Sequence, residues 1–200
     1  MSEMYEFKEF RIGDLFDIKP TKNYGLTNSK LFTSHGKVPV IVNSSRDNGV
    51  GGLVALNPTE KGGIVTFSDT TTADSIFYQP YDFIGYSHVQ GVYPKEPEKW
   101  SKKALLYFVV NFRKVTAGRF DYATKFNRKI AIELKIALPV TKTGEIDFEY
   151  MVSYIRELEL ARIRELVAYL KVAGLTDYKL TADEEQFLEE YRTLIPPGGG

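Results

Sequence analysis

A long amphipathic segment at residues 145–174 restricts the fold of this chain more than any other feature. Its apolar side chains recur at helical spacing, and Gly174 marks the expected end of the helix. A stripe this wide is not left in water, so the helix must pack on the rest of the chain or on another helix. The heptad pattern breaks near residues 159–162, which allows at most a short, imperfect coiled coil. The apolar positions are Phe148, Met151, Val152, Ile155, Leu158, Ile163, Leu166, Val167 and Leu170.

The preceding part of the chain, residues 1–144, has a different pattern. Short β-like runs between residues 38 and 93 are separated by Gly, Pro, Asn and Asp, which is typical of strands joined by turns. Helical spacing predicts a helix over 100–114, and Asn127 is a candidate cap for a short helix from Arg128. The run KIALPV, residues 135–140, reads as a final strand. The predicted fold class is α+β, with a curved, mostly antiparallel sheet and short helices followed by the long C-terminal helix.

These patterns divide the chain into three parts. Residues 1–144 form the expected first domain, residues 145–174 the long helix, and residues 175–200 a short helix with a flexible tail. Thr181 and Glu184 fit a capping box, which predicts a helix over 181–194 that stops before Pro196. This last helix has no role that the sequence assigns.

Motifs for catalysis are scarce. The chain has no cysteine, which excludes disulfides and thiolate metal sites, and its two histidines, His35 and His88, are far apart in sequence. The glycine cluster at 49–52 lacks the GK[ST] of a phosphate-binding loop, and neither a nucleophile elbow nor a methyltransferase motif is present. A hydrolase using Asp69 or Asp74 would need a pocket that the pattern does not indicate. We therefore expect no enzyme, no metal and no cofactor in this chain.

No apolar run is long enough for a membrane span, and the N-terminus lacks the features of a signal peptide. The expected location is the cytoplasm, with no membrane partner.

The charge is zero overall but unevenly distributed. Residues 1–144 carry 20 basic and 14 acidic residues, whereas residues 145–200 carry 6 and 12. Within 99–135 there are 10 basic residues and 2 acidic ones. Such a stripe suits a phosphate backbone, although a solvated helix face would explain it equally well. The candidate phosphate contacts are Lys22, Arg113, Lys114, Arg119, Tyr122, Lys125, Arg128 and Lys129. For Tyr122 and Phe126, core packing is the alternative to DNA contact.

Three polar loops, residues 21–30, 43–49 and 68–75, supply donors and acceptors that suit base edges. Phosphates are the same at every base pair, so sequence choice should come from these loops rather than from the cations. For Asn48, which precedes a glycine, a tight hairpin turn is the alternative. The candidate base readers are Asn43, Arg46, Asn48, Thr71 and Asp74.

Several segments resemble the target recognition domain in specificity subunits of Type I restriction–modification systems. They are FKEFRIGDLFDIKPTK, VPVIVNSSRDNGVGG, the stretch from GGIVTFSDTTTADS to the element Ser87-His88-Val89, and GRFDYATKFNRKIAIELKIALPVTKTGEIDFEYM. These segments lie between residues 7 and 151. Family members usually fuse two recognition domains with two long helices, so this chain resembles a half-length form, of the kind also found in Type IIB-like systems. Members of the family often have arginine or serine where Asp69 and residues 70–72 stand here.

The resemblance implies a non-catalytic subunit that binds double-stranded DNA and directs a DNA methyltransferase (modification) subunit to its site. S-adenosylmethionine and ATP with Mg²⁺ are then expected only on partner subunits. A homodimer, or a pair with another half-subunit, would form through the long helix. The alternative is a protein–protein interaction module that acts through its acidic helices. The expected dimer contacts are Met151, Ile155, Leu158, Leu166 and Leu170.

Overall fold

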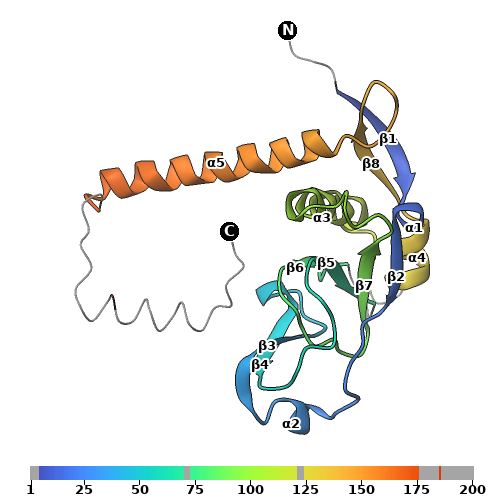
Figure 1. The fold of residues 1–200 in the computed structure, drawn as a ribbon, viewed down its shortest axis with the longest axis vertical. Coiled ribbons are helices and arrows are strands. Elements are labelled where there is room, and N and C mark those ends of the chain that lie inside the picture. Colours follow the sequence, from blue (N-terminus) through green and yellow to red (C-terminus); the bar gives the residue numbers. More distant parts are fainter. Residues whose placement is uncertain (1–4, 70–72, 121–123, 176–184, 186–200) are drawn as a thin grey trace.

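The computed structural model describes residues 5–69, 73–120, 124–175 and 185. Figure 1 shows a layered molecule in which α5 crosses one end, α3 lies beneath it, the main sheet follows, and the β3–β4 pair with α2 forms the opposite end. The strands are β1 Glu6–Arg11, β2 Phe16–Pro20, β3 His35–Ile41, β4 Val50–Val54, β5 Ile64–Ser68, β6 Phe77–Gln79, β7 Val89–Pro94 and β8 Lys135–Val140. The helices are α1 Ile12–Leu15, α2 Asn28–Leu31, η1 Asp47–Gly49, α3 Lys102–Thr116, α4 Arg128–Glu133 and α5 Phe148–Val172.

Antiparallel sheets and a long C-terminal helix were predicted and are confirmed, but the strands form three sheets rather than one. The main sheet has four antiparallel strands in the order β2-β7-β5-β6, while β1 pairs with β8 and β3 with β4. The helical turn α1 separates β1 from β2, so the first strand leaves the main sheet and pairs with the last. Residues 6–20 therefore contribute two strands to two different sheets.

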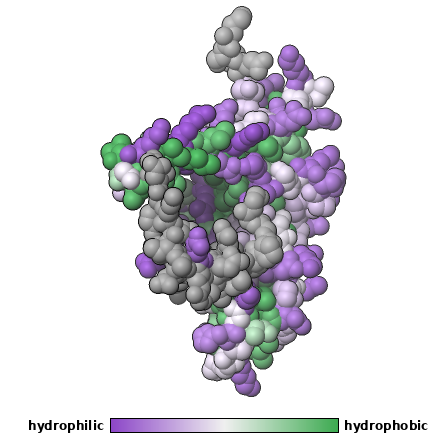
Figure 2. All heavy atoms as spheres, turned by 60° about the vertical axis from the view of Figure 1, so that its left-hand side comes forward, coloured by the Kyte–Doolittle hydropathy of each residue, from purple (hydrophilic) through white to green (hydrophobic). Residues whose placement is uncertain are grey.

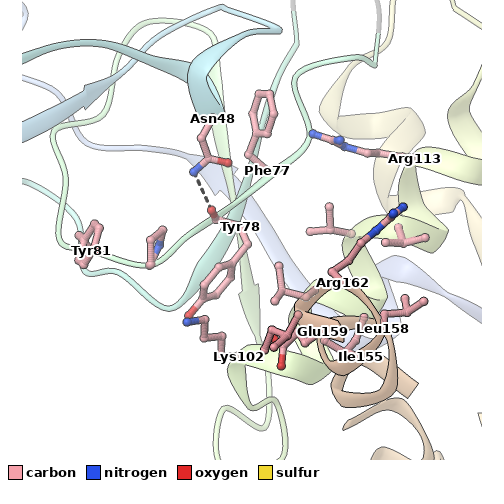
Figure 3. Close-up of a pocket in the computed structure, with 15 residues that line it drawn as sticks. Asn48, Phe77, Tyr78, Tyr81, Lys102, Arg113, Ile155, Leu158, Glu159 and Arg162 are labelled. Atoms are coloured by element: carbon pink, nitrogen blue, oxygen red, sulfur yellow. Dashed lines mark hydrogen bonds between the residues drawn. The ribbon is translucent and has the colours of Figure 1, made fainter. Parts of the chain in front are cut away.

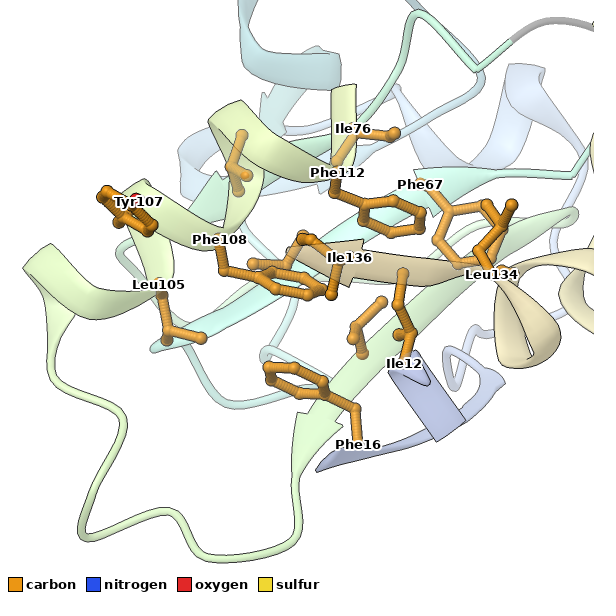
Figure 4. Packing of buried hydrophobic residues seen from close by; sticks show 14 of the residues in the cluster. Ile12, Phe16, Phe67, Ile76, Leu105, Tyr107, Phe108, Phe112, Leu134 and Ile136 are labelled. Carbon is orange, nitrogen blue, oxygen red and sulfur yellow. The ribbon is translucent and has the colours of Figure 1, made fainter. Parts of the chain in front are cut away.

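The core lies between α3 and the main sheet. Helix α3 begins at Ser101, whose Oγ accepts a hydrogen bond from the Ala104 amide at 3.3 Å, as expected for an N-cap. Phe16 packs on Phe108 with ring centroids 4.4 Å apart, and Phe67 faces Phe112 edge-on (Figure 4). The predicted helices over 100–114 and from Arg128 and the predicted strand over 135–140 are all present.

Within the described part of the chain, it is the first turns of α5 that pack on the body. The Asp147 carboxylate caps the helix by accepting a hydrogen bond from the Tyr150 amide at 2.8 Å. Met151 and Ile155 are buried against α3, and Lys103 of α3 forms an ion pair with Glu159. The helix ends before Gly174, which has a φ of 70°, as the sequence predicted.

The expected dimer contacts therefore separate into two groups. Met151 and Ile155 belong to the core of their own chain, because α3 lies directly beneath the start of α5. Leu158 and Leu166 are exposed, and Leu170 is half-buried. Figure 2 shows hydrophobic side chains gathered along α5. The exposed apolar residues of α5 are Tyr154, Leu158, Leu160, Ile163, Leu166, Val167, Tyr169 and Val172.

Within the ranges given above, no helix has both the length and the apolarity needed to cross a membrane. The same residues contain no group of three or more acidic or histidine side chains placed to hold a metal ion. The predicted helix over 181–194 lies outside the described residues.

Candidate nucleic-acid interface

The antiparallel register brings three chain segments to one end of the main sheet. Strands β2 and β5 end there at Pro20 and Ser68, and β7 begins there at Val89. Pro20 is paired with Gln90, and Ser68 with Val89. We call this the loop end of the sheet, because the connections at 21–30, 69–75 and 85–88 all leave from it.

Hydrogen bonds tie these connections to one another and to the β3–β4 loop. The Thr21 hydroxyl donates to the Val89 carbonyl oxygen at 3.0 Å, and the Tyr86 hydroxyl donates to Asn28 Oδ1. Ser68 Oγ donates to Asn43 Oδ1 at 3.1 Å, which links the loop after β3 to the end of β5. The three polar loops singled out from the sequence therefore meet at the loop end.

The candidate base readers differ in how free their side chains are. Asn43, Arg46 and Asp74 are exposed, although the Oδ1 of Asn43 accepts the hydrogen bond from Ser68. The backbone of Arg46 is held by the Ser44 hydroxyl, whereas its guanidinium has no ion-pair partner among the described residues. Thr71 lies outside the described residues.

Asn48 has a structural role instead. It belongs to the left-handed turn of η1, with a φ of 53°, and the Val42 amide closes this loop by donating to the Gly49 carbonyl at 2.8 Å. Its Nδ2 donates to the Tyr78 carbonyl at 2.9 Å and to Gln79 Oε1 at 3.3 Å. Pairing with adenine needs that amide group free to donate. Of the two alternatives for Asn48, the turn is the correct one.

Arg113, one of the cations predicted from the sequence, lies beside the loop end and is anchored there. Arg113 Nε donates to the Ile76 carbonyl at 2.7 Å, and its guanidinium lies 4.7 Å from the centre of the Phe77 ring. Burial lowers the pKa of Arg113 from its ordinary value, and the nearby Asp74 carboxylate opposes that shift. The Arg113 head group therefore fixes α3 to the start of β6.

Most of the other cations are exposed, as Arg113 itself is. Lys22, Lys114, Lys125 and Lys129 are exposed. Arg119 is also exposed, although its Nη1 donates to the Val115 carbonyl at 2.9 Å.

The segment that carries Lys125, Arg128 and Lys129 is held in place by its aromatic residue. Phe126 is fully buried, with its ring 4.9 Å from Phe67, next to the end of β5, so its role is core packing. Arg128 is half-buried. The Asn127 side chain caps α4 by accepting from the Ile130 amide at 3.1 Å, as predicted. Tyr122 lies outside the described residues.

A hydrogen-bonded group at the loop end was not among the predicted site residues. His88 Nδ1 lies 3.2 Å from Asp69 Oδ1, and Gln90 Nε2 donates to Asp69 Oδ2 at 2.8 Å. The Asp69 amide also donates to the His88 carbonyl at 2.9 Å. The SxHV element marked His88 in the sequence, but nothing in the spacing connected it to Asp69, which is 19 residues away.

A groove of about 900 Å³ runs between α3, α5 and the start of β6. Figure 3 shows Arg113 from α3 and Arg162 from α5 on its rim, with Tyr78, Ile155 and Leu158 in its lining. The lining is mainly apolar and carries no group arranged for catalysis, so this groove suits a docking surface better than an active site.

A family model described as Type I restriction modification DNA specificity domain matches residues 4–168. The Type II restriction enzyme BgcI specificity subunit S.BcgI of Heyndrickxia coagulans is 25% identical over 156 residues, which are 76% of this chain and 43% of that protein. The Type I restriction–modification system S subunit from M. genitalium has a similar fold, with a TM-score of 0.59 and 15% identity over 96% of this chain and 50% of that one. A chain from a structure of the type I R-M system matches with a TM-score of 0.50 and 16% identity, over 94% and 44% of the two chains.

The chain thus spans about half the length of the relatives that it matches.

Proposed function

This chain belongs to the family of Type I restriction modification DNA specificity domains, and from that premise we propose that it binds double-stranded DNA at a chosen sequence. In this proposal it is a specificity subunit of a restriction–modification system and performs no catalysis of its own. Residues 1–144 are the recognition domain, 145–174 are the assembly helix, and 175–200 are an appendage.

One observation carries the proposal: three polar loops lie together at the loop end of the main sheet, and Phe126 of the basic segment packs on Phe67 beside them. Donors and acceptors on the loops suit base edges, while the exposed lysines beside them suit phosphates. Loops held on a packed sheet keep their side chains at a fixed geometry, which base readout requires. Asn43, Arg46 and Asp74 are the proposed base readers, together with Thr71 in the segment beyond the described residues.

Phosphate contacts are proposed for Lys22, Lys114, Arg119, Tyr122, Lys125, Arg128 and Lys129. Arg113 contributes its charge from an anchored position rather than by reaching out to the backbone. These contacts hold the recognition domain on the duplex without choosing a sequence.

Assembly is proposed to use the exposed apolar face of α5. Leu158, Leu166 and Leu170, with Ile163 and Val167 between them, would pack on the same face of a second half-subunit. A two-fold pair would set two recognition domains on one duplex, which suits a symmetric, interrupted target. Large exposed apolar patches generally mark such contacts.

The proposed partners are DNA and a DNA methyltransferase subunit, in the cytoplasm. S-adenosylmethionine would be bound by the methyltransferase, and ATP with Mg²⁺ by a motor–nuclease subunit, so this chain is proposed to need no cofactor.

The test is a salt titration of duplex binding by the full chain, followed by selection from random duplex DNA. A DNA-binding subunit should lose affinity steeply with salt, as counterions return to the phosphates, and should enrich one motif. A flat salt dependence with no enriched motif would favour the alternative, a protein–protein interaction module acting through its acidic helices.

A further inference from the structure

We propose that His88 is a specificity-determining residue whose Nε2 accepts a hydrogen bond from the exocyclic amino group of an adenine or a cytosine in the major groove. Asp69 and Gln90 are positioning residues that fix the imidazole for this contact. The inference rests on the proposed function and deepens it, because it names the chemistry that one side chain reads.

The geometry fixes one ring nitrogen and leaves the other free to approach DNA. His88 Nδ1 faces Asp69 Oδ1 at 3.2 Å, and the other carboxylate oxygen accepts a hydrogen bond from Gln90 Nε2 at 2.8 Å. The side chain of His88 is 65% exposed, whereas that of Asp69 is 20% exposed. The carboxylate is therefore mostly buried, and the imidazole that contacts it is exposed to solvent.

The tautomer follows from these contacts. An ionised carboxylate only accepts hydrogen bonds, so Nδ1 must carry the proton that it donates to Asp69. In the neutral ring, Nε2 is then an acceptor. Gln90 strengthens this arrangement because it donates to the same carboxylate from a buried position in β7.

Two further features indicate that the cluster serves more than folding. His88 has a φ of 65°, a left-handed conformation that is strained for a residue with a β-carbon. Gln90 is buried, yet its Oε1 is the one buried side-chain atom without a hydrogen-bond partner in the described part of the chain. Both features cost stability, and such costs persist mainly where function requires the geometry.

An acceptor at this position distinguishes among bases. Adenine N6 and cytosine N4 are the amino donors in the major groove, whereas guanine O6 and N7 and thymine O4 are acceptors that would face the Nε2 lone pair. The loop end already gathers the proposed base readers, since Ser68, the neighbour of Asp69, bonds Asn43. His88 thus extends the same reading surface.

The first test concerns the tautomer and needs no DNA. The chain has two histidines, so ¹⁵N correlation spectra in an alkaline buffer resolve both rings, and His35→Gln assigns them. We expect His88 to be protonated at Nδ1. A ring protonated at Nε2 would overturn the proposal.

The second test is selection from random duplex DNA with the wild type, His88→Gly and Asp69→Asn. Glycine tolerates the positive φ, so His88→Gly removes the ring without adding strain. We expect this variant to lose an A or C preference at one position per half-site, by roughly tenfold, while the other positions and nonspecific affinity are kept. Asp69→Asn should weaken the A or C preference at that same position and leave the other positions unchanged. Duplexes in which the selected base is replaced by its analogue without the amino group should bind wild type as weakly as they bind His88→Gly.

The matched control is Asp82→Asn. Like Asp69, Asp82 accepts two hydrogen bonds. Its donors are the Lys61 ammonium group and the Gly62 amide, and it lies by the start of β5. It should leave the motif unchanged.

The outcomes separate the two proposals. If the wild type enriches no motif, the proposed function fails. If it enriches a motif that His88→Gly leaves intact, the proposed function stands and the role of His88 is refuted. A uniform loss of affinity across all sequences would assign His88 to a phosphate and would also refute base reading.

Discussion

The Nε atom of Arg113 donates a hydrogen bond to the carbonyl oxygen of Ile76 at 2.7 Å, which fastens the C-terminal part of α3 to the residue before β6. The guanidinium also lies over Phe77. Arg113 is therefore part of the scaffold that carries the loop end, as well as one of its positive charges.

Arg113→Ala should lower the free energy of unfolding by about 1–2 kcal/mol, because a charge-assisted hydrogen bond to a partly buried carbonyl is lost. Its neighbour Lys114 offers the matched control: Lys114→Ala should change stability by less than about 0.5 kcal/mol. Urea unfolding of both variants measures the difference. Equal stabilities would contradict the anchoring role.

Replacing Lys125 and Lys129 together with alanine should weaken binding to all duplexes alike. Each lost phosphate contact should flatten the slope of log affinity against log salt by about 0.9. Lys8→Ala with Lys142→Ala removes the same charge at the β1–β8 pair, outside the main sheet, and should leave the slope as it is. If the two double variants behave identically, the basic segment is a solvated surface.

Arg46 and Asn48 are close in sequence but should respond differently. Arg46→Ala should abolish preference at one position per half-site and leave stability unchanged, since its guanidinium has no ion-pair partner among the described residues. Asn48→Ala should cost about 1–2 kcal/mol through the lost bond to the Tyr78 carbonyl. Thermal unfolding and selection from random DNA separate the effects. If Arg46→Ala selects the same motif as the wild type, Arg46 is not a base reader and other residues read that position.

The exposed and buried apolar positions of α5 should also differ. Ile163→Asp with Leu166→Asp should dissociate an assembly while the domain stays folded, because both side chains are exposed. Ile155→Asp should instead destabilise the chain by several kcal/mol, since it places an unpaired charge against α3. Sedimentation and thermal unfolding give the two readouts. A wild-type monomer at high micromolar concentration, with no partner present, would count against the homodimer.

Alkaline pH should loosen α5. Burial raises the pKa of Tyr107 to about 12, and its ring lies 5.5 Å from that of Tyr154 on α5. The unfolded chain ionises this tyrosine near its usual pKa of about 10, so the stabilisation is complete below that pH and is lost as pH rises toward 12. Tyr107→Phe should show a smaller stability loss between pH 9 and 11.5 in urea unfolding. Parallel losses in both proteins would exclude this residue as the cause.

The local elements could be predicted because each depends on near neighbours. Asn127 caps the helix at Arg128, and apolar spacing defines α5, without reference to the rest of the chain. The apolar stripe of α5 has a buried start and an exposed remainder because α3 packs on the start alone. The position of α3 cannot be read from the sequence of α5, so Met151 and Ile155 were predicted as dimer contacts although they belong to the core. The separation of β1 from the main sheet could not be predicted for the same reason. It results from a four-residue helical turn and from pairing with a distant strand.

The site was predictable in its residue types more than in its individual members. The polar loops lie together at the loop end, but the role of Asn48 depends on its hydrogen bond to the carbonyl of Tyr78, 30 residues away. The pairing of His88 with Asp69 likewise arises only when β5 and β7 align. Long-range register of this kind leaves no periodic signal in one sequence.

The pairing of β1 with β8 also has a consequence for how the domain forms. Glu6 is opposite Val140, so the first strand cannot complete its ladder until nearly all of the recognition domain has been synthesised. Contacts between such distant residues slow folding, because a long loop must close before they can stabilise anything. During translation β1 has an unpaired edge until β8 has been synthesised. Variants that weaken β8 should therefore aggregate during synthesis more readily than the stability of the folded protein suggests.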